Sequence, residues 1–129
     1  MKRIILKCAV ATALIAPNFS ARGADAVDFD RDIKPILEIS CVKCHGEEKP
    51  KGGLQITTRA KAIKGGDSGT VLVPGDALKS PLYTSTILPP DDEKAMPPKG
   101  DRLPKADTDK LKTWIEQGAV WPEGPAVIL

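Results

Sequence analysis

Two cysteines and the only histidine of the chain stand within one short segment, Cys41-Val42-Lys43-Cys44-His45. This Cys-x-x-Cys-His pattern is the signature of covalent haem attachment. The spacing lets one turn of helix present both sulfurs to the vinyl groups on one edge of a porphyrin, and the adjacent histidine is then held beneath the iron. The motif therefore predicts thioether bonds from Cys41 and Cys44 and a proximal iron ligand from His45.

The first residues indicate a secretory leader. A basic start is followed by an apolar stretch over residues 4–17, which Lys7 interrupts, and small residues precede position 24. The alternative is a retained anchor, but a membrane-spanning helix needs about 20 apolar residues. We predict a signal peptide over residues 1–23, one domain over residues 24–129, and a periplasmic or otherwise extracytoplasmic location without stable membrane insertion.

Other chemistries of a Cys-x-x-Cys pair fit this chain less well. A structural zinc site needs four nitrogen or sulfur ligands, and only two cysteines and one histidine remain once Cys8 leaves with the leader. A thioredoxin-like dithiol needs a βαβ setting, which the sequence lacks. A disulfide across two residues closes a very small loop and contributes little. One covalently attached haem c is therefore the predicted cofactor.

The second axial ligand follows from a short list of donors. His45 is the only histidine, so ligation by two histidines of one chain is excluded. Met96 is the only methionine after the initiator, and a thioether ligand raises the potential of an electron-transfer haem. Pro97 and Pro98 stiffen the loop around it. The alternative is a methionine that fills a gap in the core; we predict that Met96 binds the iron.

The composition is that of a small domain with little material for a core. Aromatic residues make up 4% of the chain, which has 12 prolines and 11 glycines. Small domains bury surface inefficiently, so a bound cofactor would supply missing apolar bulk. The formal net charge of +2 includes four basic residues of the leader, and the remainder is therefore at −2. Nothing in this balance supports a nucleic-acid partner, which calls for a clustered basic face.

Apolar spacing and helix caps predict a mostly α-helical chain without strands. Apolar residues at 29, 33, 36 and 37 form a helical stripe, and Pro35 either places the start of the regular helix near Lys34 or kinks it there. Residues 91–104, which include Met96, are expected to be irregular. The remaining predicted signals are an N-cap at Asp28 or Asp30, a helix over 59–63 capped by Thr57 or Thr58, a helix over 81–88 after Ser80, and a helix over 105–117 that starts after Pro104 and ends before Gly118.

Several other side chains have a structural and a cofactor-related interpretation. Phe29 and Trp114 are predicted to pack where the terminal helices cross, while Trp121 covers either the haem or the helix end. Tyr83 is expected to pack in the core or at the surface, with a hydrogen bond to a haem propionate as the alternative. The basic residues that can pair with propionates, although each is more often solvated, are Arg59, Lys51 and Lys99.

Together with the haem motif, the wider pattern resembles the planctomycete-type cytochrome c domain over about residues 27–121. The matching landmarks are Phe29, Asp32-Ile33, Pro35-Ile36-Leu37, Gly52-Gly53-Leu54, Gly65-Gly66-Asp67-Ser68-Gly69, Pro74-Gly75, Ser80, Met96-Pro97-Pro98, Leu103, Trp114-Ile115 and Gly118-Ala119. The resemblance implies an all-α fold similar to class I cytochromes c, wrapped around one covalently bound haem. It also implies histidine and methionine ligation, here by His45 and Met96.

The function predicted from these residues is electron transfer by a mono-haem c-type cytochrome, without enzymatic activity, toward redox partner proteins. A second hypothesis is a peroxidase-like enzyme or gas sensor, which needs a vacant sixth position on the iron. A third is a haem-bearing interaction module in a larger complex. Met96 in its proline-rich loop argues against the second hypothesis, as does the lack of a distal histidine.

Overall fold

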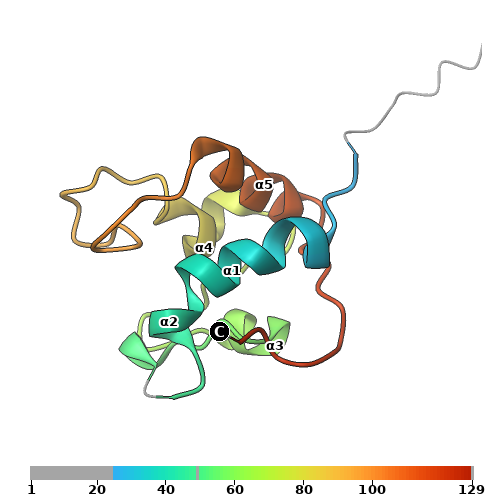
Figure 1. Ribbon diagram of the computed structural model, residues 1–129, viewed down its shortest axis with the longest axis horizontal. Helices are drawn as coiled ribbons and strands as arrows, with labels where there is room; N and C mark the ends of the chain where they lie inside the picture. The colour runs from blue at the N-terminus through green and yellow to red at the C-terminus, as the bar shows by residue number, and fades with distance from the viewer. Residues whose placement is uncertain (1–24, 49, 129) are drawn as a thin grey trace, which may run out of the picture.

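The computed structural model describes residues 25–48 and 50–128 (Figure 1). The predicted leader over residues 1–23 lies outside this part. The described chain is helical and has no strand, only an isolated bridge between Gly66 and Gly69, which confirms the all-α class. Its elements are the π-helical turn η1 (Phe29–Ile33), α1 (Lys34–Ser40), α2 (Val42–His45), the 3-10 turn η2 (Lys51–Gly53), α3 (Arg59–Lys64), the 3-10 turn η3 (Ala77–Lys79), α4 (Pro81–Thr84) and α5 (Lys105–Glu116).

The first helical segment starts with a wide turn and becomes regular at Lys34. The side chain of Asp28 caps it by accepting a hydrogen bond from the Arg31 amide at 2.8 Å. Pro35 lies in the first turn of α1, where its missing N–H has no helical partner to lose. The predicted start near Lys34 is confirmed, and the whole apolar stripe that begins at Phe29 is buried.

The helix α5 packs against this segment through an aromatic cluster. The rings of Phe29 and Trp114 lie 5.8 Å apart, and Trp121 stacks on Phe29 at 4.6 Å. Gly118 lets the chain turn back after α5, with a φ of 100°, and the Trp114 indole donates to the Val120 carbonyl at 2.8 Å. The packing predicted for Phe29 and Trp114 is confirmed, and Trp121 belongs to the same cluster.

The helix α4 is shorter than its sequence predicts. It starts after Ser80 as expected but ends at Thr84 instead of residue 88. The Ser85 hydroxyl donates to the Pro81 carbonyl, and the Thr86 hydroxyl donates to the Tyr83 carbonyl, both at 2.6 Å. Side-chain hydroxyls that bond to nearby carbonyls offer the backbone an alternative to helix. The chain therefore leaves the helix early and enters the long loop that carries Met96.

That loop stands apart from the rest of the molecule, as Figure 1 shows at the left between α4 and α5. Residues 89–94 are all exposed, and the irregular conformation predicted for residues 91–104 is confirmed. The helix α5 then begins after Pro104, which supplies no side-chain cap. Within the described residues, no helix has the length and apolar character needed to cross a bilayer.

Candidate haem-attachment site

The predicted attachment residues lie in one turn at the junction of two helices. Cys41 ends α1 and precedes α2, and its carbonyl accepts hydrogen bonds from the amides of Cys44 at 3.1 Å and His45 at 2.9 Å. Val42 is buried and fixes this turn against the core. The fold therefore brings Cys41, Cys44 and His45 together in the short helix α2 and the residue that precedes it.

Both cysteines are free thiols of intermediate exposure. Burial raises the pKa of the Cys41 thiol to about 12, so this group stays protonated at neutral pH. Zinc binds the thiolate form, and the part of the chain that the structure describes contains no group of three or more His, Cys, Asp or Glu side chains that could hold a metal ion. Among the described residues, the two thiols are not joined to each other and lie in no such group.

The imidazole of His45 is oriented by a backbone carbonyl. Its Nδ1 lies 3.1 Å from the carbonyl oxygen of Lys51. A carbonyl oxygen only accepts hydrogen bonds, so this contact places the proton on Nδ1 and leaves the lone pair of Nε2 available for a metal. Histidine ligands are commonly held in this way by a group outside the coordination sphere. Two free thiols and an Nε2 donor in one turn are the donor set that a covalently attached haem requires.

The segment that carries the Lys51 carbonyl is fixed where Gly52 packs against the turn over residues 65–69. The Gly52 carbonyl, next to Lys51, accepts from the Asp67 amide at 2.9 Å. A Cβ on Gly66 would lie 2.3 Å from the Gly52 oxygen, so only glycine allows this approach. The absence of a side chain at Gly66 therefore lets the 65–69 turn press against the segment that orients His45.

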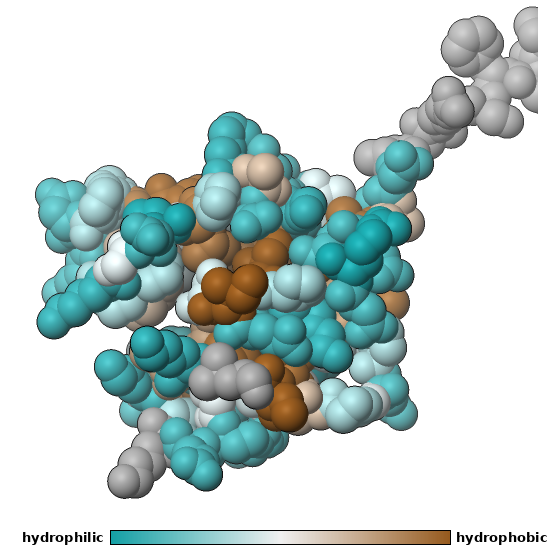
Figure 2. All heavy atoms as spheres, in the orientation of Figure 1, coloured by the Kyte–Doolittle hydropathy of each residue, from teal (hydrophilic) through white to brown (hydrophobic). Residues whose placement is uncertain are grey.

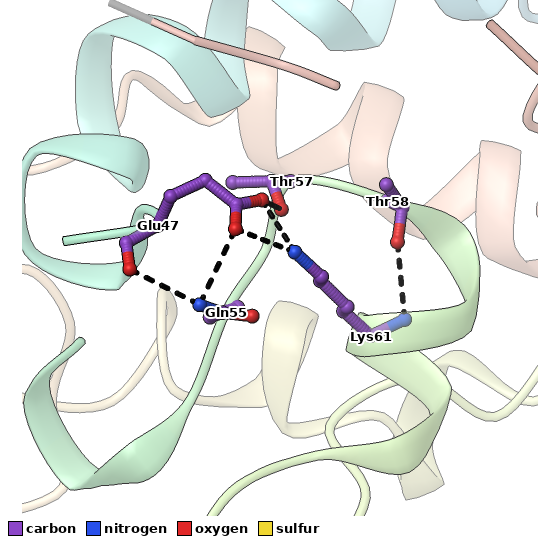
Figure 3. A network of polar contacts seen from close by, with 5 residues as sticks. All are labelled: Glu47, Gln55, Thr57, Thr58 and Lys61. Atoms are coloured by element: carbon purple, nitrogen blue, oxygen red, sulfur yellow. Dashed lines mark hydrogen bonds and ion pairs between the residues drawn. The ribbon is translucent and has the colours of Figure 1, made fainter. Parts of the chain in front are cut away.

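A network of hydrogen bonds around Glu47, here called the brace, follows His45 in the chain (Figure 3). The Glu47 carboxylate accepts from the Lys61 ammonium at 2.5 and 2.6 Å and from the Thr57 hydroxyl at 2.5 Å. The Gln55 amide donates to the Glu47 carbonyl at 3.2 Å. The hydrogen bond from Lys61, and then that from Thr57, holds the pKa of Glu47 below its ordinary value. This network ties the end of α2 to α3, and no residue spacing in the sequence signals it.

Met96 lies outside the attachment turn and is hydrogen-bonded to the residue that follows α4. Its amide donates to the Ser85 carbonyl at 2.9 Å. The side chain of Met96 is half-buried, whereas Ala95 before it is 1% exposed. The buried alanine and the amide hydrogen bond anchor the loop at the residue that the sequence predicts as a ligand.

Arg102 is a residue of this region that sequence reasoning missed. Its guanidinium donates to the carbonyls of Thr86 at 2.9 Å, Leu88 at 2.8 Å and Pro97 at 3.3 Å. The three carbonyls belong to the two limbs of the loop that carries Met96. A lone basic residue after a proline-rich loop has no pattern that reveals such contacts.

The other side chains with a cofactor-related interpretation fall into two groups. Arg59 donates to the Ala119 carbonyl at 3.1 Å, and Tyr83 is buried in the hydrophobic core, so both have structural contacts. Lys51 and Lys99 are exposed, and their pairing with propionates stays a prediction.

Apolar side chains also remain on the surface. On the face seen in Figure 2, hydrophobic residues interrupt a largely polar exterior. Ile39 is 80% exposed although it lies only two residues before Cys41.

Comparison with known proteins found one match. A family model described as Planctomycete cytochrome C matches residues 41–100, from the first motif cysteine to just past Met96 and its two prolines. No match was found among curated proteins or among solved structures. Cytochrome c domains imply covalently bound haem and suggest haem-based electron transfer, and they are typically exported. The resemblance inferred from the sequence is thus confirmed, because residues 41–100 match the model of the planctomycete cytochrome c family.

Proposed function

We propose that this chain is an exported mono-haem c-type cytochrome that carries single electrons between redox partner proteins. In this proposal Cys41 and Cys44 would form the thioether bonds, and His45 and Met96 would bind the iron. The observation that carries it is the hydrogen bond between His45 Nδ1 and the Lys51 carbonyl, within the same turn as two free thiols. This contact leaves Nε2 of His45 free to bind iron beside the two thiols.

Bound haem would supply one-electron Fe(III)/Fe(II) chemistry. The contacts of His45 and Met96 within the chain would hold these ligands in place in both oxidation states. The Lys51 carbonyl keeps the His45 ring in one tautomer and makes Nε2 a better donor. A thioether from Met96 favours the reduced state and closes the sixth position to small molecules.

The proposal is tested on the protein produced with a haem-attachment system. Its mass counts the haems and locates the mature N-terminus, for which we expect one haem and cleavage before Ala24. The oxidised protein should have the near-infrared sulfur-to-iron absorption band. Met96→Leu, which keeps the volume but removes the donor, should abolish the band, lower the reduction potential and allow the reduced protein to bind carbon monoxide.

Lys94→Gln is the matched control, because Lys94 is exposed in the same loop, and this variant should leave the spectrum unchanged. A wild-type protein without the band, whose high-spin spectrum responds to carbon monoxide or peroxide, would refute the Met96 assignment. The peroxidase-like or sensor function would then take its place.

A further inference from the structure

The guanidinium of Arg102 joins the two limbs of the loop that carries Met96. Nη2 donates to the Thr86 and Leu88 carbonyls on the limb that leaves α4, and Nη1 donates to the Pro97 carbonyl on the returning limb. Pro97 directly follows Met96 in the chain. One side chain therefore fixes the width of the loop at the position of the methionine.

The rest of the loop has little else to hold it. The tip over residues 89–94 is exposed, and long exposed segments lose much conformational entropy when they are ordered. The Met96 amide bond to Ser85 and the burial of Ala95 anchor the loop at two adjacent residues only. Hydrogen bonds from a charged donor are about twice as strong as neutral ones, so the three bonds from Arg102 are a large share of what closes the loop.

The identity of this residue matters because of its geometry. The planar guanidinium of arginine presents several donors in a fixed fork, whereas lysine offers a single point charge on a flexible stem. Arg102 is half-buried, and in the described structure it forms no ion pair with a carboxylate. Its polar contacts are directed to loop carbonyls.

We propose that Arg102 is a positioning residue that holds the loop closed so that the Met96 sulfur is presented to the iron. The inference rests on the proposed ligation by Met96. It goes further by assigning control of that ligation to a side chain that does not touch the iron. Loss of the three Arg102 hydrogen bonds should release the methionine without removing it.

The test uses the haem-containing protein with Arg102→Gln, Arg102→Lys and, as a matched control, Arg59→Gln. Arg59 also donates to a backbone carbonyl, that of Ala119, outside the loop. In Arg102→Gln we expect loss of most of the sulfur-to-iron band, binding of carbon monoxide by the reduced protein, and amide exchange at Met96 faster by about ten- to a hundredfold. Arg102→Lys should recover these properties only in part, and Arg59→Gln should keep them even if it unfolds more easily.

The outcomes separate this inference from the function on which it rests. A wild-type protein without the band would overturn the ligation by Met96, and with it any positioning role. A wild-type protein with the band, together with an Arg102→Gln protein that keeps both the band and slow exchange at Met96, would overturn the positioning role of Arg102 alone. Equal loss of the band in Arg102→Gln and Arg59→Gln would also overturn it, since the effect would then be general destabilisation.

Discussion

The two residues proposed as iron ligands are held by different means. His45 sits in a helical turn, and the main-chain carbonyl of Lys51, six residues later, orients its ring. Met96 sits in an exposed loop, which is held by the amide bond of Met96 to Ser85, the burial of Ala95 and the three hydrogen bonds of Arg102. The region around His45 is rigid because main-chain segments pack directly against each other at Gly52 and Gly66. The Met96 loop depends mainly on a single long side chain and is easier to open.

The largest predicted effect tests the rigid region. In Gly66→Ala the new Cβ would lie 2.3 Å from the Gly52 oxygen, and two main-chain segments cannot separate without disturbing the Lys51 carbonyl. Overpacking of this kind costs about 3 kcal/mol. We therefore expect the free energy of unfolding of the haem-containing protein to fall by that amount in denaturant titrations, together with a changed reduction potential.

Gly100→Ala is the counterpart in the loop region. Gly100 has a φ of +85°, but a Cβ there would meet no atom within 4 Å, so only backbone strain of about 1 kcal/mol is expected. If the two alanine variants lost equal stability, the contrast between a packed and an open region would be wrong.

The sequence predicts the features that depend on neighbouring residues better than those that depend on distant ones. The start of regular helix at Lys34, the Thr58 cap of α3 and the turn at Gly118 depend on neighbours in the chain. The sequence predicts the turn directly and includes the other two among a pair of alternatives each. The Cys-x-x-Cys-His turn is equally local. Such features are encoded by residue type at fixed spacing, and tertiary contacts do not have to be known.

The features that were missed all involve partners farther along the chain or main-chain acceptors. The bond from His45 to the Lys51 carbonyl has no side-chain signature at its acceptor. Glu47 meets Lys61 across 14 residues, and Arg102 reaches carbonyls up to 16 residues away. Each depends on how the loops fold back, so residue types alone do not predict it.

An intermediate effect is expected where α4 gives way to the loop. Thr86→Val keeps the shape of a buried side chain but removes the hydroxyl that donates to the Tyr83 carbonyl. Loss of one such hydrogen bond costs about 1 kcal/mol. Thr84→Val is the control, because among the described residues no hydrogen bond from the Thr84 hydroxyl is found. Thermal unfolding of both should show a lower midpoint for Thr86→Val only; equal midpoints would mean that the hydroxyl does not stabilise the end of the helix.

The smallest effect concerns the brace after His45 and depends on pH. Lys61 holds the folded-state pKa of Glu47 below its ordinary value of 4.5, so ionised Glu47 stabilises the folded protein. A group with a lowered folded-state pKa contributes fully above its unfolded pKa, and the contribution is lost as the pH falls through the folded-state value. Glu47→Gln should therefore unfold slightly more easily than wild type near neutral pH, because the exposed pair contributes little in water.

The difference between the two proteins should shrink as the pH falls below about 4.5, the ordinary value from which the Glu47 pKa is lowered. Denaturant midpoints measured from neutral to acidic pH test this, with Glu116→Gln as control. Glu116 pairs with Lys112 on α5, away from the haem motif in the chain. Only Glu47→Gln should also alter the near-infrared or Soret absorption, since only Glu47 braces the turn that carries His45. A spectrum unchanged by Glu47→Gln at every pH would mean that the main-chain contacts alone keep this turn rigid, and the contrast with the Met96 loop would then be sharper than proposed.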